Sequence, residues 1–345
     1  MFAGSSVGRA VQWLAAVKAH EPGIPARPAI EVSTWPGVEL EEVILGAKRY
    51  ARSLAKTRPD EANDLLLRGA TMHADIAQLI PDEVVRRSPK QQRMFVVEDG
   101  REQGSRFVSI HWELGRSLLD DISPAPAAHA GVLLWYQRVA MDLLRLRSLA
   151  EAAVHMPRAR RMFPSDASLL FASGILHERF ASASLQAAAA SVVAADRGVT
   201  TVSPARAELG RAERFFRETL VLRPDYLEAR VRHGRVLGVL GRHDQAAEAL
   251  QLAIEGGVTG EWLYYAELFL GSEKEAAGND AAARGHFERA AALYPYAQSP
   301  RLALSQLSRR AGDRGGAQRE VRILAELPKG ERRREDPWWN YFAVR

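Results

Sequence analysis

The chain has 345 residues, of which 47% are hydrophobic and 26% charged, and its formal net charge is +5. This composition is ordinary for a folded globular protein, and the length allows two domains or one long array of repeats. The absence of cysteine excludes disulfides, thiolate metal sites and a cysteine nucleophile. The arginines are scattered along the predicted helices beside acidic residues, so we expect no nucleic-acid binding despite the positive charge.

Residues 1–38 are rich in proline, and we expect them to form an extended N-terminal segment. No apolar run reaches the roughly 18 residues that a membrane span requires. The start, MFAGSSVGRAVQWLAAVKAH, carries one early arginine and a short apolar run that Gln12 interrupts, which makes a poor signal peptide. The sequence therefore predicts no membrane span and leaves the compartment open between cytoplasmic and exported.

Residues 39–129 are predicted to be an N-terminal helical region. Apolar residues recur at helical spacing over 39–57 and again over 60–80, where Asp60 is a plausible N-cap. A third helix is expected over 107–119. The alternative for the stretch RMFVVEDGREQGSRFVSI is a small hairpin around its Asp-Gly turn signal.

A pattern with a period of about 34 residues follows. Counted from Leu227, the eighth residue is Gly234, the twentieth is Ala246 and the twenty-fourth is Leu250. Five such units share a small residue at position eight and an alanine at position twenty. The position-eight residues are Ala140, Gly174, Gly234, Gly271 and Ser305, and the position-twenty residues are Ala152, Ala212, Ala246, Ala283 and Ala317. A glycine inside a helix costs about 1 kcal/mol relative to alanine, and close packing of two antiparallel helices offsets that cost.

This pattern resembles the tetratricopeptide repeat (TPR), a helix–turn–helix unit. The resemblance covers 133–331, over half of the chain, and it departs from the family at position four, where tryptophan is usual. It implies an all-α fold: a right-handed α-solenoid of TPR repeats, which the N-terminal helical region caps. The repeats lie near 133–166, 167–226 with an insertion at about 181–204, 227–263, 264–297 and 298–331.

Residues 332–345 form an aromatic C-terminal tail with two tryptophans, a tyrosine and a phenylalanine. The favoured interpretation is a plug that covers the apolar end of the last repeat. The alternatives are a patch that docks a partner protein and a disordered tail.

Enzymatic motifs are weak. The fragment GSSVG at residues 4–8 matches a nucleophile elbow, but three residues before the serine cannot supply the strand that this motif needs. His73 with Asp75, and His111 with Glu113, are the best candidates for a metal or acid–base site. Both histidines adjoin apolar residues, so we favour buried core histidines. We predict a non-enzymatic protein without metal or cofactor, and we keep a metal-binding or enzymatic protein as an alternative.

The resemblance also implies where a ligand binds, because the first helix of each TPR lines the concave groove and supplies contacts from fixed positions. Carried over, these positions are Gln137, Arg145, Phe171, Glu178, Arg179, Glu228, Arg235, Tyr265, Glu275, Gln306, Arg309 and Arg310. Arginine forks suit carboxylates, so the expected partner is a protein or peptide with acidic groups. The alternative is that these arginines form a solvated face with local acidic partners.

The sequence thus predicts a protein–protein interaction scaffold that binds its partner in the groove. The alternative is a structural subunit of a larger assembly, which contacts its neighbours through the aromatic tail or the long insertion. The sequence specifies neither the partner nor the oligomeric state.

Overall fold

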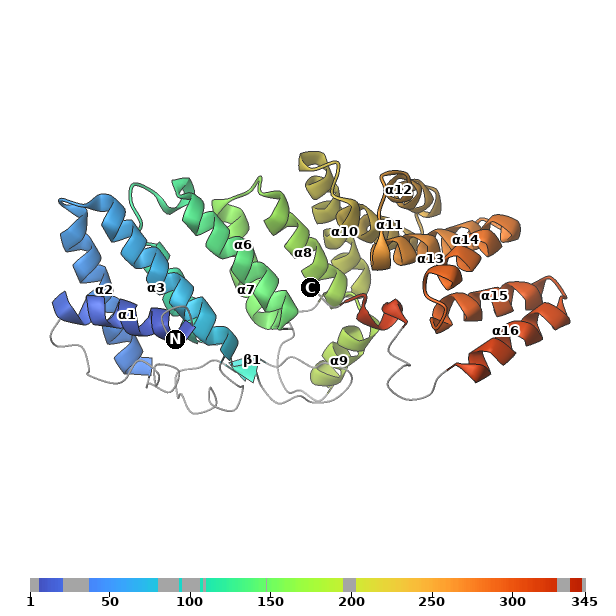
Figure 1. The fold of residues 1–345 in the computed structure, drawn as a ribbon, viewed down its shortest axis with the longest axis horizontal. Helices are drawn as coiled ribbons and strands as arrows, with labels where there is room; N and C mark the ends of the chain where they lie inside the picture. Colours follow the sequence, from blue (N-terminus) through green and yellow to red (C-terminus); the bar gives the residue numbers. More distant parts are fainter. Residues whose placement is uncertain are drawn as a thin grey trace. The chain divides into compact units, whose positions relative to one another are not determined.

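The computed structural model describes residues 6–20, 37–79, 93–94, 106–107, 110–146, 148–194, 203–327 and 336–342. The chain divides into two compact units, which we call unit 1 (Met1–Pro164 and Ala195–Thr201) and unit 2 (Ser165–Ala194 and Val202–Arg345). Within the described ranges, all of the regular secondary structure is helical except one pair of two-residue strands (Figure 1). The predicted all-α fold is confirmed. None of the described helices is long and apolar enough to cross a membrane.

Unit 1 is organised around one long helix, α3, which packs against α1, α2, α5 and α6. Two tryptophans fix this core by donating their indole N–H groups to carbonyls of α3: Trp13 to Leu65 at 2.8 Å and Trp135 to Ala70 at 3.0 Å. The helices are α1 (Ser6–His20), α2 (Gly37–Ala55), α3 (Pro59–Leu79), α5 (Ile110–Leu119), η2 (Pro126–Ala128), α6 (Ala130–Arg145) and α7 (Leu149–Met162).

Two segments of unit 1 differ from the favoured predictions. Helix α1 lies in the stretch that we expected to be extended, because residues 6–20 contain no proline and bury Trp13, Leu14 and Val17 at helical spacing. Strands β1 (Arg93–Met94) and β2 (Arg106–Phe107) pair antiparallel, with Arg93 opposite Phe107. They are the two ends of the hairpin alternative, and the turn between them lies outside the described residues.

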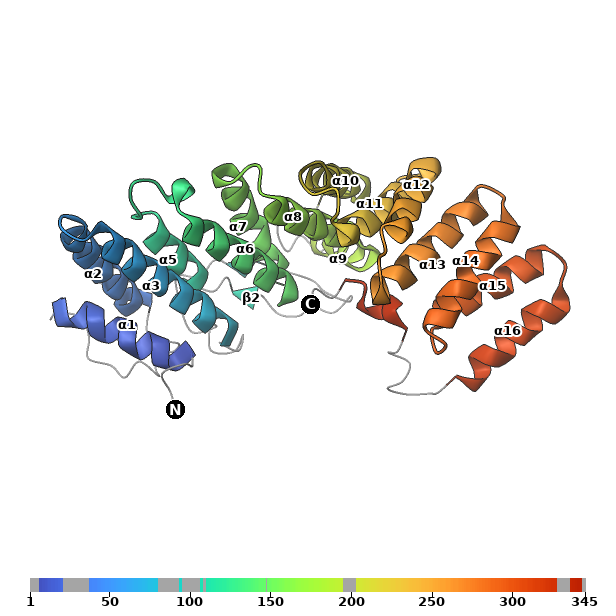
Figure 2. The same ribbon diagram turned by 45° about the horizontal axis from the view of Figure 1, so that its top comes forward.

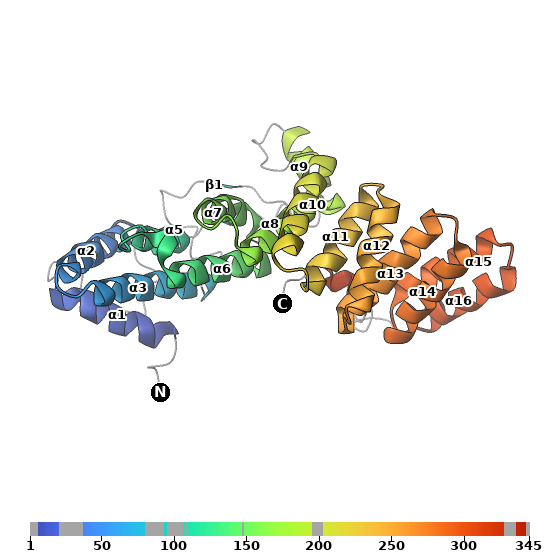
Figure 3. The same ribbon diagram turned by 90° about the horizontal axis from the view of Figure 1, so that it is seen from above.

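Unit 2 is a series of helical hairpins in which each helix packs on its neighbours along the chain (Figure 3). The hairpins are α8 with α10, α11 with α12, α13 with α14, and α15 with α16. Helix α9 lies in the segment predicted as the insertion. The bounds are α8 (Ala167–Phe180), α9 (Ala183–Ala194), α10 (Ala205–Leu222), α11 (Leu227–Val239), α12 (His243–Glu255), α13 (Gly260–Ala276), α14 (Asp280–Leu293), α15 (Gln298–Arg310), α16 (Arg314–Glu326) and η4 (Pro337–Asn340).

The glycines at position eight lie where the two helices of a hairpin cross. A Cβ atom added to Gly174 would lie 2.4 Å from Phe216, and one added to Gly271 would lie 2.6 Å from Phe287. At Gly234 the neighbour is Leu250, at 2.7 Å. These distances are shorter than any real contact, so the large residue at position twenty-four fills the space that the glycine leaves. This confirms helix–turn–helix repeats of the tetratricopeptide type.

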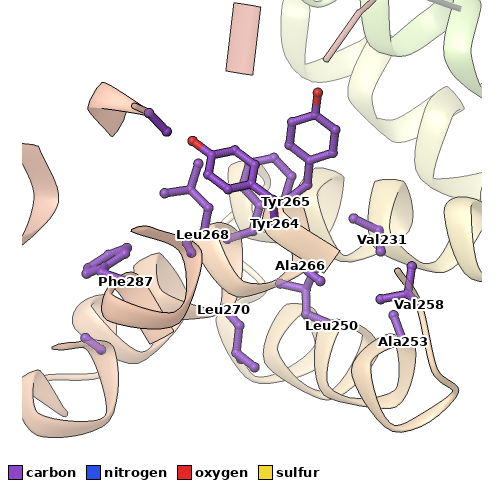
Figure 4. Packing of buried hydrophobic residues seen from close by; sticks show 14 of the residues in the cluster. Val231, Leu250, Ala253, Val258, Tyr264, Tyr265, Ala266, Leu268, Leu270 and Phe287 are labelled. Atoms are coloured by element: carbon purple, nitrogen blue, oxygen red, sulfur yellow. The ribbon is translucent and has the colours of Figure 1, made fainter. Parts of the chain in front are cut away.

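The core of unit 2 is continuous across the hairpins. Figure 4 shows Leu250 and Ala253 of α12 packed beneath α13, with the rings of Tyr264 and Tyr265 extending away from them. Both rings are buried, yet each carries a hydroxyl that needs a hydrogen-bond partner. Those partners come from the C-terminal end of the chain.

Candidate protein-binding site

Residues 336–342, which we call the C-terminal segment, are part of unit 2 and pack on the first helices of its hairpins (Figure 2). We call the surface beneath them the docking face. It consists of residues from α8, α11, α13 and the first turn of α15. They are Glu178, Arg179, Arg232, Arg235, Trp262, Tyr264, Tyr265, Phe269, Gln298 and Ser299.

Asp336 anchors the start of the segment and is 1% exposed. One carboxylate oxygen accepts the backbone N–H groups of Gln298 and Ser299, at 3.0 and 2.9 Å, and the Ser299 hydroxyl at 2.8 Å. The other oxygen accepts the Tyr264 hydroxyl at 2.7 Å. The first N–H groups of a helix have no acceptor within the helix and carry its positive dipole end, so α15 offers an anion site that Asp336 fills.

Side chains of the docking face also bind the backbone of the segment. The Tyr265 hydroxyl donates to the Pro337 carbonyl at 2.5 Å. Arg232 donates to the Tyr341 carbonyl at 3.5 Å, and Arg179 donates to the Phe342 carbonyl. Every residue of a peptide carries a backbone carbonyl, so these contacts do not depend on the side chains of the segment.

A buried carboxylate organises the far end of the segment. One oxygen of Glu178 accepts Arg235 and the Tyr341 hydroxyl, each at 2.7 Å, and the other accepts Arg232 at 2.8 Å. The side chains of Glu178 and Arg232 are 0% and 1% exposed. A buried charge is stable only when it is paired and hydrogen-bonded, and here the two arginines and one carboxylate satisfy one another.

Aromatic rings surround the Arg235 guanidinium. Its central carbon lies 4.6 Å from the Tyr341 ring centre, 5.2 Å from that of Phe342 and 5.6 Å from that of Trp338. Cation–π contacts of this length contribute about 0.5–2 kcal/mol each, most where water is excluded. Burial raises the pKa of the Tyr341 hydroxyl well above its usual value. Tyr341 is therefore a neutral phenol, which donates a hydrogen bond to Glu178.

The structure brings four of the residues carried over from the TPR family together beneath the segment. These are Glu178, Arg179, Arg235 and Tyr265. A fifth, Glu228, accepts Arg232 at 3.0 Å, and burial raises its carboxyl pKa.

The other carried-over residues lie elsewhere. Phe171 is buried, with its ring centre 4.5 Å from that of Tyr226. Arg145, in unit 1, pairs with Asp142 at 2.9 Å, and Arg310 pairs with Glu275 at 2.7 Å. The remaining ones are Gln137, on α6 of unit 1, and Gln306 and Arg309, both exposed on α15.

The sequence did not identify Asp336 or six residues of the docking face, which are Arg232, Trp262, Tyr264, Phe269, Gln298 and Ser299. Arg232 stands at position six of its repeat, which the family does not use for ligands. The run EDPWWNYF in the sequence could have indicated this site. Its acidic residue and its aromatic rings, once buried, call for hydrogen-bond donors and for other aromatic rings around them. The tail contacts α8, α11, α13 and only the first turn of α15, rather than covering the last hairpin, since α15 and α16 contain no aromatic residue to pack on it.

The carboxylates of the candidate metal or acid–base site in unit 1 are paired with arginines. Asp75 pairs with Arg138, and Glu113 accepts Arg116 at 2.9 Å and Arg158 at 2.5 Å. His73 is buried at 1% exposure, and the side chain of His111 lies outside the described residues. Over the part of the chain that the structure describes, no group of three or more metal-binding side chains converges.

The fold of unit 2 is that of a helical-repeat protein, with helix–turn–helix hairpins that resemble the tetratricopeptide repeat. No family model matches the chain, and no curated protein matches it. Among solved structures it is similar to Pseudomonas aeruginosa PilF (16% identity, 58% of this chain and 78% of that chain, TM-score 0.45). It is also similar to PilW, described as a widely conserved type IV pilus biogenesis factor (18%, 59% and 82%, 0.44), and to MamA from Desulfovibrio magneticus RS-1 (19%, 56% and 94%, 0.43). At these TM-scores the likenesses carry no argument about function.

Proposed function

We propose that the protein is a non-enzymatic scaffold that binds a protein or peptide partner on the docking face. One observation carries this proposal: the docking face holds a peptide segment by its backbone carbonyls, its carboxylate and its aromatic rings. The contacts come from α8, α11, α13 and α15, which are the first helices of their hairpins. In the TPR resemblance these are the helices that bind ligands.

The test compares two arginine substitutions of the same kind. Arg235→Gln removes the cation from the docking face, whereas Arg309→Gln removes one from the exposed side of α15. Both substitutions are made in a chain that also carries Asp336→Ala, which weakens docking of the chain's own segment so that it does not mask the effect. The two double variants and the Asp336→Ala parent are used as bait in native lysate, after circular dichroism has shown equal helix content. We expect a partner that the parent and the Arg309→Gln variant retain and the Arg235→Gln variant loses by tenfold or more. A partner retained equally by both variants would contradict binding at the docking face.

A second candidate function rests on Trp339, which is 63% exposed although Asp336, Pro337 and Tyr341 of the same segment are buried. An exposed tryptophan within an anchored segment is suited to a contact between subunits of a larger assembly. Trp339→Ala leaves the docked residues in place, so loss of the partner in this variant alone would favour the assembly subunit.

A further inference from the structure

We propose that the partner presents a segment with the chemistry of Asp336–Phe342: an acidic residue, then proline, then aromatic residues that include a buried tyrosine. This segment binds by displacing the C-terminal segment of the chain. The inference rests on the proposed function and specifies its ligand. It replaces the generally acidic peptide with a mainly aromatic one that carries a single leading acid.

The subsite for the acid is selective because all its donors converge on one carboxylate. The N–H groups of Gln298 and Ser299, the hydroxyls of Tyr264 and Ser299 and, within the segment, the N–H group of Trp338 donate to Asp336, which is 1% exposed. A neutral side chain there would leave the N–H groups of Gln298 and Ser299 without a strong acceptor in a buried position. The partner must therefore bring an aspartate or glutamate to the first turn of α15.

The aromatic subsite is selective for tyrosine. The Tyr341 ring centre lies 5.0 Å from that of Tyr265 and 5.5 Å from that of Phe269, with Arg232 and Arg235 on its flanks. Its hydroxyl donates to Glu178 at 2.7 Å. Phenylalanine would fill the ring site but would supply no donor to this buried carboxylate.

Two of the arginines predicted to attract a generally acidic peptide, Arg235 and Arg310, have carboxylate partners within unit 2. Arg235 pairs with Glu178, and Arg310 pairs with Glu275 and Asp280. Their charges are largely neutralised where they stand, so further acids in the ligand gain little. Once the segment has left, a ligand must match the aromatic rings of Trp262, Tyr265 and Phe269 and the anion site at the first turn of α15.

A tethered segment competes strongly, since a short tether gives an effective concentration in the millimolar range. The apparent affinity for a free ligand is reduced by the fraction of molecules in which the face is open. Weakening the segment within the chain should therefore tighten the binding of a free peptide of the same sequence.

The experiment uses the full chain and a fluorescein-labelled peptide, DPWWNYF, followed by fluorescence anisotropy. We expect Asp336→Ala to bind this probe at least tenfold more tightly than wild type does. Asp313→Ala, which removes the N-cap of α16 away from the docking face, is the matched control and should bind like wild type. A probe with alanine in place of its aspartate, or phenylalanine in place of its tyrosine, should bind at least tenfold more weakly to Asp336→Ala.

Equal probe affinity for Asp336→Ala and wild type, or equal binding of the altered probes, would overturn the inference. So would a concentration-dependent dimer of Asp336→Ala in light scattering that the probe does not dissociate, because the occupant would then be a second copy of the chain. These failures leave the proposed function standing if Arg235→Gln still loses its partner in lysate. Retention of the partner by Arg235→Gln would instead defeat the proposed function itself.

Discussion

The hairpin crossings and the docking face of unit 2 are built in opposite ways. A crossing joins neighbouring helices through glycine against phenylalanine or leucine, with no charge. The docking face joins residues more than 100 positions apart through a buried carboxylate, arginines and tyrosines. A repeat can encode the first kind of contact locally, whereas the second depends on one unrepeated sequence at the end of the chain.

The largest effect should come from the charge at the centre of the docking face. Glu178→Gln keeps the shape of the side chain but leaves Arg232, which is fully buried, with Glu228 as its remaining carboxylate. Breaking a buried ion pair costs about 3–5 kcal/mol of unfolding free energy. Chemical denaturation followed by circular dichroism measures this loss.

Glu288→Gln on the exposed side of α14 is the control, and it should change the unfolding free energy by less than about 0.5 kcal/mol. A loss below about 1 kcal/mol in Glu178→Gln would show that the docking face is not held by its buried charges.

In unit 1, by contrast, the hairpin of α6 and α7 buries a histidine, His155. Desolvation lowers the pKa of His155 from 6.5 to about 4, against the opposing effect of Glu113. As the pH falls, His155 is therefore protonated in the unfolded chain before it is protonated in the folded chain. The stability that its burial contributes above pH 6.5 is lost as the pH falls toward 4. Burial disfavours the charged form of Glu113, but its hydrogen bonds with Arg116 and Arg158 and the charge of His155 outweigh that effect and lower its pKa. The contribution of Glu113 to stability is therefore lost in the same direction, at lower pH.

The expected loss attributable to His155 between pH 7 and pH 4 is about 3 kcal/mol of unfolding free energy. Denaturant titrations at the two pH values, on wild type and His155→Leu, measure it. The pH dependence should be shallower in His155→Leu. Identical pH dependence in the two chains would refute the assignment.

A smaller effect is expected at a crossing. Gly271→Ala gains about 1 kcal/mol in helix propensity but forces Phe287 to move, since the new Cβ would lie 2.6 Å from its ring. Overpacking of a core costs about 1–3 kcal/mol, so the net result is a loss of about 1 kcal/mol in thermal or denaturant unfolding. A gain in stability would show that the crossing has room to spare.

The smallest effect, and of opposite sign, belongs to a glycine outside the crossings. Gly210 of α10 has no heavy atom within 4 Å of an added Cβ. Gly210→Ala should therefore stabilise the protein by about 0.5–1 kcal/mol through helix propensity alone. Measured by the same denaturant unfolding, Gly271→Ala and Gly210→Ala distinguish a glycine that close packing requires from one that alanine can replace. A loss of stability in Gly210→Ala would contradict this distinction.

The repeat could be predicted from sequence because its determinants are local and periodic. Small residues at position eight and alanines at position twenty mark each crossing, and Gly241, Gly278 and Gly312 end the first helices at positive φ values. The site was only partly predictable. The family positions indicated Glu178, Arg235 and Tyr265, but their joint partner is Tyr341, and no spacing rule connects residue 178 to residue 341.

Hydrogen–deuterium exchange reports whether residues 336–342 occupy the docking face. The amides of Gln298 and Ser299 lie at the first turn of α15, where the helix supplies no acceptor, and both donate to Asp336. In Asp336→Ala these two amides should exchange at least tenfold faster than in wild type, while the amides in the middle of α15 keep their rates. Unchanged exchange at Gln298 and Ser299 would contradict the account.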